Sequence, residues 1–227
     1  MFTLERVVPW GRSFDEYRRM FDLSSDDLRL RILGCADGPA SFNAEATAAG
    51  FTVRSCDPLY RFGAADIARR IADTTEVIIE QTRRNQEEFV WNFIHSVDEL
   101  RILRVSTMER FLADFETGKS EGRYVDAELP ALPFDDGEFD LALCSHFLFL
   151  YSEQFSEEFH LAAIREMNRV AGEVRIFPLL ALGGAHSPYL EPVSHQLRND
   201  RRTVTIDVVP YEFQRGGNQM MRVRSAG

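Results

Sequence analysis

The chain has 227 residues, a length that one α/β domain commonly fills and that is sufficient to bury a sizeable core. Hydrophobic residues make up 44% and charged residues 27% of the sequence, which is typical of a globular domain and excludes disordered and fibrous classes. The formal net charge of −10 disfavours a nucleic-acid-binding surface, because affinity for phosphates comes largely from Lys and Arg. We therefore expect a single domain over residues 1–227 that acts on a small molecule and not on nucleic acid.

The cysteines and the amino terminus indicate the cellular setting. Cys35, Cys56 and Cys144 form no CxxC pair and are odd in number, so we expect neither a disulfide framework nor a metal site. All three fall at predicted strand ends, where we interpret them as small buried hydrophobic residues. The amino-terminal stretch MFTLERVVPWGRSFDEYRR has early charges and no long apolar run, so it predicts neither a signal peptide nor a membrane span. The expected location is the reducing cytoplasm without membrane contact, and the oligomeric state is left open.

The first part of the chain predicts a short helix and then a strand, a turn and a helix. Ser13 and Glu16 have the spacing of a capping box, which places a helix start at Ser13. LRLRILG, residues 28–34, predicts the first strand. It stops at the small-residue loop CADGPAS, residues 35–41, and an Ala-rich helix follows over residues 42–49.

The next part predicts a second strand and a long helical insertion. FTVRSC, residues 51–56, predicts a strand that ends at Asp57-Pro58, since proline cannot continue a central ladder. From about 62 to 115 the chain has no proline and shows apolar residues at helical spacing. This insertion is longer than an ordinary crossover, and we expect it either to cover a ligand crevice or to pack on one face of the sheet. A break at Gly118–Gly122 precedes RYVDAEL, residues 123–129, a third strand ending near Asp126.

The last part predicts two buried strands and a hairpin. LALC, residues 141–144, is a short apolar run of the kind found in strands covered on both faces. A helix then stops near Gly172, and VRIFPLLAL, residues 174–182, predicts a fifth parallel strand. TVTIDVV and NQMMRV flank a turn at Gly216-Gly217 with no room for a helix between them, so the last two strands form an antiparallel hairpin.

Candidate binding residues lie at the strand ends, because ligands of doubly wound sheets sit outside the carboxyl ends of the strands. The first end is made of small or turn-forming residues, which let the backbone approach a ligand closely, although a tight turn without a ligand would look the same. After the second strand, the Asp57 carboxylate is able to accept hydrogen bonds from ribose hydroxyls, or it starts an ordinary Asp-Pro turn. The third and fourth ends offer Asp126 and the Ser145-His146 pair.

The segments ILGCADGPASF, VRSCDPLY, YVDAELPALPFDDGEFDLALCSHFLFLY and REMNRVAGEVRIFPLL together resemble the class I S-adenosylmethionine-dependent methyltransferases, over nearly the whole chain. The resemblance implies a doubly wound, mostly parallel seven-stranded α/β sheet with a C-terminal antiparallel hairpin, which agrees with the predicted ending. It also implies that the loop after the first strand wraps the methionine part of S-adenosylmethionine. The acid after the second strand would hold the ribose, and residues after the third would contact adenine.

The sequence departs from this family in the first loop. Gly34 stands where the family usually has an acid, and Ala36 and Ala40 replace two of its three glycines. Asp37 lies in the same loop and is a candidate for the missing carboxylate. The stretch WGRSFDEYRRMFDLS resembles a segment of some bacterial members in which Arg and Tyr close over the cofactor carboxylate, here Arg12 and Tyr17.

The resemblance and the strand ends together predict a set of cofactor-binding residues. They are Arg12, Tyr17, Gly34, Cys35, Ala36, Asp37, Gly38, Asp57, Pro58, Asp126, Ala127 and Ser145. Methyl transfer mainly requires alignment of donor and acceptor and exclusion of water, although a base is sometimes needed to unmask the acceptor. His146 is the candidate catalytic residue, and Tyr151 and His186 also follow predicted strands.

Two other functions use the same elements. A dinucleotide-dependent oxidoreductase also has a βαβ unit with a terminal acid, but GCADGPA lacks the GxGxxG spacing that a pyrophosphate requires. A non-catalytic methyltransferase-like binding protein would act through partners and would expose an apolar patch. The Phe-rich run 147–159 is the candidate for such a patch, or it forms the wall of the crevice or part of the core. The methyl acceptor itself is not identified by the sequence.

Overall fold

The computed structural model describes residue 4 and residues 7–225, which fold around a seven-stranded sheet in the order β3-β2-β1-β4-β5-β7-β6. The strands are β1 Ile32–Cys35, β2 Val53–Cys56, β3 Tyr124–Val125, β4 Phe139–Ser145, β5 Ala171–Phe177, β6 Arg202–Val208 and β7 Gln219–Ser225. The first five are mutually parallel, whereas β7 runs antiparallel to both β5 and β6. The predicted fold class is confirmed, including the C-terminal hairpin.

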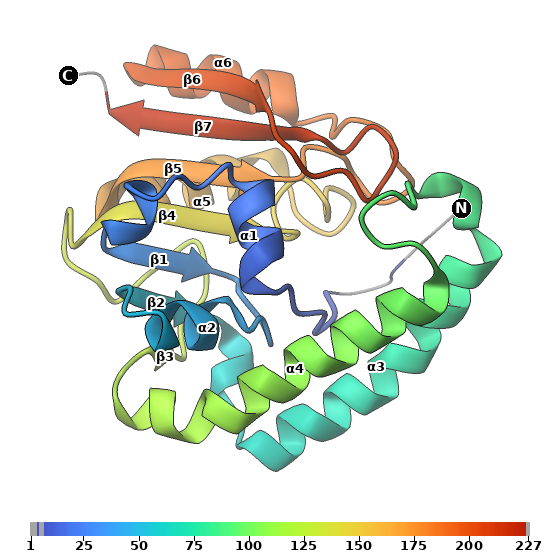
Figure 1. The fold of residues 1–227 in the computed structure, drawn as a ribbon. Coiled ribbons are helices and arrows are strands. Elements are labelled where there is room, and N and C mark those ends of the chain that lie inside the picture. The colour runs from blue at the N-terminus through green and yellow to red at the C-terminus, as the bar shows by residue number, and fades with distance from the viewer. Residues whose placement is uncertain (1–3, 5–6, 226–227) are drawn as a thin grey trace.

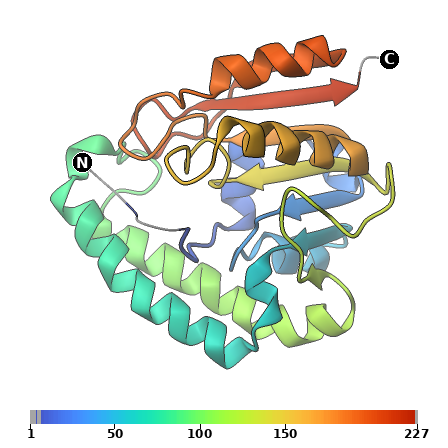
Figure 2. The ribbon, with the colours of Figure 1, turned by 180° about the vertical axis from the view of Figure 1, so that it is seen from behind.

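Helices cover both faces of this sheet, as Figures 1 and 2 show from opposite sides. The helices α1 Phe14–Met20 and α2 Phe42–Ala48 pack on one face, and α5 Glu157–Val170 and α6 Leu190–Asn199 pack on the other. Neighbouring residues of β4 enter opposite cores, because successive strand side chains alternate: Leu141 and Leu143 face α1 and α2, while Ala142 and Cys144 face α5. Among the described helices, none is long and apolar enough to cross a membrane.

The predicted insertion after β2 is a pair of long helices. They are α3 Ala64–Arg84 and α4 Val97–Ser120, which pack against each other. Two details of the prediction were wrong. Residues 85–96 are largely non-helical, and α4 continues to Ser120, so Gly118 is not a break. Gly118 lies inside the helix, and glycine fits at this position because Tyr124 and Arg123 fill the space that a side chain would need.

Three predicted elements have different bounds. Leu28 and its neighbours form a 3₁₀ turn, and β1 begins only at Ile32. Helix α5 ends at Val170, near Gly172 as predicted, but it passes directly into β5 without a loop, so Gly172 lies in the strand, which begins earlier than the predicted Val174. The strand ends at Phe177, because Pro178 has no N–H to donate to the ladder, and the apolar residues after it leave the sheet. Helix α6, over residues 190–199, was not predicted.

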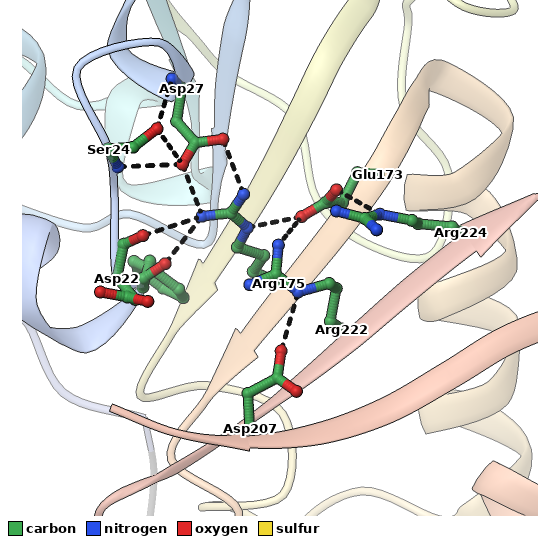
Figure 3. Close-up of polar contacts among 9 residues, drawn as sticks. Asp22, Ser24, Asp27, Glu173, Arg175, Asp207, Arg222 and Arg224 are labelled. Carbon is green, nitrogen blue, oxygen red and sulfur yellow. Dashed lines mark hydrogen bonds and ion pairs between the residues drawn. The ribbon is translucent and has the colours of Figure 1, made fainter. Parts of the chain in front are cut away.

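A buried network of charges joins the antiparallel hairpin to the rest of the sheet (Figure 3). Arg175 on β5 is 2% exposed and donates to Asp27 at 2.8 Å and to Glu173 at 2.6 Å. Glu173 also accepts from Arg222 on β7, which in turn donates to Asp207 on β6. Every buried charge in this network has an opposite partner, which is what a structural role requires.

Candidate functional site

A cavity of about 970 Å³ lies at the carboxyl ends of the parallel strands. Its floor includes Ala36, Asp57 and Ala127, which follow β1, β2 and β3, and Ser145, the last residue of β4. Side chains of α3, among them Thr74 and Ile78, form the opposite wall, and residues 7–10 before α1 also line it. Figures 1 and 2 show the two insertion helices lying across these strand ends. The insertion therefore lies over the crevice.

Most of the predicted binding residues meet in this cavity. Its lining includes Arg12, Tyr17, Ala36, Asp37, Gly38, Asp57, Pro58, Ala127 and Ser145, and also His146. Three predicted residues are not part of the lining. Gly34 and Cys35 are buried within β1, and Asp126 is exposed and pairs with Arg61 at 3.4 Å.

The loop after β1 brings a carboxylate back over Gly34. A Cβ at Gly34 would overlap the carboxyl group of Asp37, so only glycine leaves room for it. The hydroxyl of Tyr17 donates to Oδ1 of Asp37 at 2.5 Å, and the hydroxyl of Ser55 donates to Oδ2 at 2.6 Å. Asp37 thus fills the position next to Gly34 where the resembled family carries its acid. Tyr17 contacts this carboxylate directly.

The backbone of the same loop adopts left-handed conformations at Gly38 and also at Ala36, which stands where the resembled family has a glycine. Ala36 has φ 53° and Gly38 has φ 52°. An alanine in the left-handed region costs about 1–2 kcal/mol, so this loop conformation lowers the stability of the fold. The N–H groups of Ala36 and Asp37 both donate to the carbonyl of Cys56, at 2.9 and 3.4 Å, which fixes the loop to the end of β2.

Asp57 is held by the backbone on both sides. Its Oδ2 accepts from the N–H of Gly38 at 2.8 Å and its Oδ1 from the N–H of Leu59 at 2.7 Å. Burial raises the pKa of Asp57 to about 6, and the nearby charge of Asp37 contributes in the same direction. Burial also raises the pKa of Asp37 to about 6. Each Asp57 oxygen keeps a second lone pair for a ligand hydroxyl.

A fully buried ion pair anchors α4 to α1. Arg104 donates to both oxygens of Glu16 at 2.7 Å, and the Tyr211 hydroxyl adds a bond to Glu16 at 2.9 Å. Burial alone would raise the pKa of Glu16, but the charge and hydrogen bonds of Arg104 lower it to about 2. The capping-box spacing predicted the helix start that Glu16 supports, but nothing in the sequence indicated Arg104 as its partner.

Arg12, next to this pair, has no carboxylate partner among the described residues. It is 9% exposed and donates to the carbonyl of Trp10 at 2.6 Å, and its Nε is buried without a partner. In the described part of the chain it forms no ion pair. Burial and the charge of Arg104 lower the pKa of Arg12 to about 10. Two guanidinium groups thus share one carboxylate, and the excess positive charge faces the cavity.

His146 is the first residue after β4 and has φ 53°, an uncommon conformation for a residue with a side chain. Its Nδ1 lies 2.9 Å from the hydroxyl of Ser145. Burial and the charges of Arg12 and Arg104 lower its pKa well below the usual value, so the ring is neutral at pH 7. Tyr151 also lines the cavity, whereas His186 is exposed and does not.

The Phe-rich run forms a wall of the cavity. Phe147, Phe155 and Phe159 all line it, and the rings of Phe155 and Phe159 stack at 4.4 Å between centroids. This run is therefore not the exposed patch that a partner-binding protein would need.

The three cysteines lie side by side in the sheet. The strand register places Cys35 beside both Cys56 and Cys144, and all three are buried and unpaired. Burial raises the pKa of Cys144 to about 12, which keeps its thiol protonated and apolar in character. No group of three or more potential metal ligands occurs within residues 7–225 or at residue 4.

The sheet and its C-terminal hairpin give this chain the fold of the class I S-adenosylmethionine-dependent methyltransferases. No protein-family model matches the sequence. The uncharacterized protein MJ0045 of Methanocaldococcus jannaschii is 33% identical over 223 residues, which cover 98% of each chain. The chain belongs to the family of this archaeal protein.

Solved structures with a similar fold are more distant in sequence. A possible histamine N-methyltransferase (TM1293) of Thermotoga maritima is 12% identical, with a TM-score of 0.47 over 94% of this chain and 89% of that one. Magnesium protoporphyrin IX methyltransferase (ChlM) of Synechocystis PCC 6803, solved with bound SAM, is 12% identical, with a TM-score of 0.46 over 93% and 90%. A putative RNA methyltransferase (PH1948) of Pyrococcus horikoshii is 6% identical, with a TM-score of 0.43 over 89% and 79%. With TM-scores below 0.5, none of these matches assigns a ligand to this chain.

Proposed function

We propose that this chain binds S-adenosylmethionine in the cavity and transfers its methyl group to a small-molecule acceptor. The observation that carries the proposal is the arrangement of charge around one cavity. Arg12, a buried guanidinium with no ion pair among the described residues, and two carboxylates at strand ends, Asp37 and Asp57, line the same space. S-adenosylmethionine has a matching set of groups, namely a carboxylate, an ammonium and a ribose diol.

The proposed roles follow from this match. Arg12 binds the amino-acid carboxylate, which relieves its unpaired charge. Asp37 lies beside Gly34 and binds the ammonium, and Asp57 accepts from the ribose hydroxyls with its remaining lone pairs. Pro58 and Ala127 follow β2 and β3 and form the surface for adenine.

The remaining space is available for the acceptor. Small-molecule pockets commonly measure roughly 300–1,000 Å³, so a cavity of about 970 Å³ is large enough for a donor and an acceptor together. The walls hold the two in line and exclude water. His146 is neutral and lines the cavity after β4, where it is placed to take a proton from an acceptor hydroxyl or N–H. Tyr151 lies in the same part of the wall.

The two alternatives have less support. A dinucleotide pyrophosphate requires a GxGxxG turn, which the loop after β1 lacks, and the Asp37 carboxylate in that loop would repel phosphates. A purely partner-binding role would need an exposed apolar surface, and the Phe-rich run is turned into the cavity. The net charge of −10 supports a small acceptor over nucleic acid, and the three free thiols support a reducing compartment such as the cytoplasm.

Ligand-induced stabilisation tests the proposal. We expect S-adenosylhomocysteine to raise the unfolding temperature and NAD and NADP to leave it unchanged, because only a ligand of the folded state stabilises it. Calorimetric titration then gives the affinity. Equal responses to S-adenosylhomocysteine and NAD, or no response to S-adenosylhomocysteine, would contradict the proposed binding of S-adenosylmethionine.

A further inference from the structure

We infer that the methyl acceptor is an uncharged aromatic molecule, bound in the end of the cavity that lies farthest from Asp57. This inference rests on the proposed function, since it takes the other end of the cavity to hold the cofactor. It concerns the part of the wall near β5 and β7, on the opposite side of β1 from β2 and β3.

This part of the wall, here called the apolar end, is built from three separate segments. Leu182 follows β5, Phe213 lies in the connection between β6 and β7, and Ile78, Thr82, Phe89 and Leu100 come from the insertion. The insertion and the β6–β7 connection are joined by backbone hydrogen bonds, since Val90 N–H donates to the carbonyl of Phe213 at 2.7 Å and Arg215 N–H to the carbonyl of Glu88 at 2.9 Å. These two segments of the apolar end are therefore held together.

The charged residues of the cavity lie elsewhere. In the described lining, Asp57, Arg61, Arg69, Arg70 and Asp73 come from the end of β2 and the first half of α3. None of the six residues of the apolar end carries a charge. A charged acceptor placed there would lose its hydration and find no opposite charge, which is costly. This distribution favours an uncharged acceptor.

The polar residues near the apolar end carry no charge at pH 7, and they include Gln214, which follows Phe213 in the cavity lining. The Thr82 hydroxyl already donates to the carbonyl of Ile78 at 2.9 Å. The Tyr151 oxygen accepts from the N–H of Val8 at 3.4 Å, which leaves its own hydrogen for a ligand. His146 lies at the border between the two ends, with Nδ1 beside Ser145 and Nε2 remaining. The Tyr151 hydroxyl hydrogen and Nε2 of His146 are thus available to an acceptor that directs one hydroxyl or N–H at this border.

The shape of the wall favours a flat ring. Phe89 and Phe213 stack with centroids 4.9 Å apart, and Trp91 packs edge-on against Phe213 at 5.5 Å. Aromatic walls of this kind gain energy from ring contacts beyond simple burial. An uncharged aromatic compound meets three conditions: it carries no charge, it offers one hydroxyl or N–H, and it has a flat ring.

Three naphthalene probes that share one ring system and differ in charge test the inference. We expect 2-naphthol to bind to protein saturated with S-adenosylhomocysteine at least tenfold more tightly than the anion 2-naphthoate or the cation 2-naphthylmethylammonium, measured by calorimetry. Phe213→Ala should weaken naphthol binding by about tenfold and leave the affinity for S-adenosylhomocysteine unchanged. Phe213→Leu keeps the apolar volume but removes the ring, so it should also weaken naphthol and serves if the alanine variant folds poorly.

The matched control is Phe93→Ala. Phe93 packs against Tyr211 in the same region but is not part of the cavity lining, so naphthol binding should not change. Charged probes that bind as tightly as naphthol, or Phe213 variants that bind it like the parent, would overturn the inference. The separate titration with S-adenosylhomocysteine keeps the two proposals apart: its failure counts against the cofactor, whereas selective failure of naphthol counts against the acceptor class.

Discussion

Arg12 gives a prediction in which stability and binding change in opposite directions. The guanidinium is buried next to Arg104 without a carboxylate, and its pKa falls from 12.5 to about 10. One pKa unit corresponds to about 1.4 kcal/mol, so the charge costs the folded state about 3 kcal/mol. Water in the cavity screens part of this cost, and the bond to the Trp10 carbonyl returns about 1 kcal/mol. Arg12→Gln should therefore raise the free energy of unfolding of the ligand-free protein by about 1–2 kcal/mol.

The same substitution should weaken the cofactor. A charge-assisted hydrogen bond contributes roughly 1.5–3 kcal/mol, so the affinity for S-adenosylhomocysteine should fall by about ten- to a hundredfold. Urea unfolding of the ligand-free protein and calorimetric titration measure the two effects. Arg69→Gln is the matched control, because Arg69 also lines the cavity but is exposed and paired with Asp66, and it should change neither quantity much. An Arg12 variant that is less stable and binds S-adenosylhomocysteine normally would refute the assignment.

Three further substitutions test the groups around Arg12. Glu16→Gln leaves Arg104 buried without its partner and should lower the free energy of unfolding by about 3–5 kcal/mol. In the parent, the contribution of Glu16 to stability is present above pH 4.5 and is lost as the pH falls toward 2. Acid unfolding of both proteins checks this dependence. Asp57→Ala should weaken S-adenosylhomocysteine about ten- to a hundredfold by titration, and binding to the parent should weaken as the pH falls through about 6, where Asp57 becomes protonated. Ala36→Gly removes the left-handed alanine and should raise the free energy of unfolding by about 1 kcal/mol in urea.

The sheet was predictable because its strands are local signals. LALC and VRSC are short apolar or alternating runs bounded by turn residues, and each became a strand within a few residues of its predicted position. The errors occurred where tertiary contacts decide. Helix α5 does end near Gly172, but β5 begins before the predicted Val174, because Ala171 and Glu173 pair with β4 in the ladder. Helix α6 buries Leu190, Val193 and Leu197 at helical spacing and has Pro192 in its first turn, a position that helices tolerate, but it was not predicted.

The candidate site also has a part that the sequence predicted and a part that depends on tertiary contacts. Residues at strand ends, such as Asp57 directly after β2 and Ser145 as the last residue of β4, were found because strand ends share one edge of a parallel sheet. The isolation of Arg12 was not predictable, since it depends on Arg104 taking Glu16, a residue 88 positions away. The position of Asp37 over Gly34 is an intermediate case. The sequence shows the missing acid and a candidate replacement, but only the fold of the loop brings the two together.

The insertion gives the last prediction, which concerns motion. A cover that opened as a whole would have to separate its tip from the β6–β7 connection. That tip is held by Val90 N–H donating to the Phe213 carbonyl at 2.7 Å and by Arg215 N–H donating to the Glu88 carbonyl at 2.9 Å. Helix α4 is also fixed at its middle by the buried pair of Arg104 and Glu16.

We therefore expect the insertion to be a fixed wall and the segment before α1 to be the part that responds to ligand. In hydrogen exchange, the amides of Val90 and Arg215 should be protected without ligand, because their partners are already in place. S-adenosylhomocysteine should then increase protection mainly in residues 7–12, which line the cavity and include Arg12, and should change α4 little. Fast exchange at Val90 and Arg215 in the free protein, with slowing across residues 64–120 on binding, would show instead that the helical pair opens and closes as a lid.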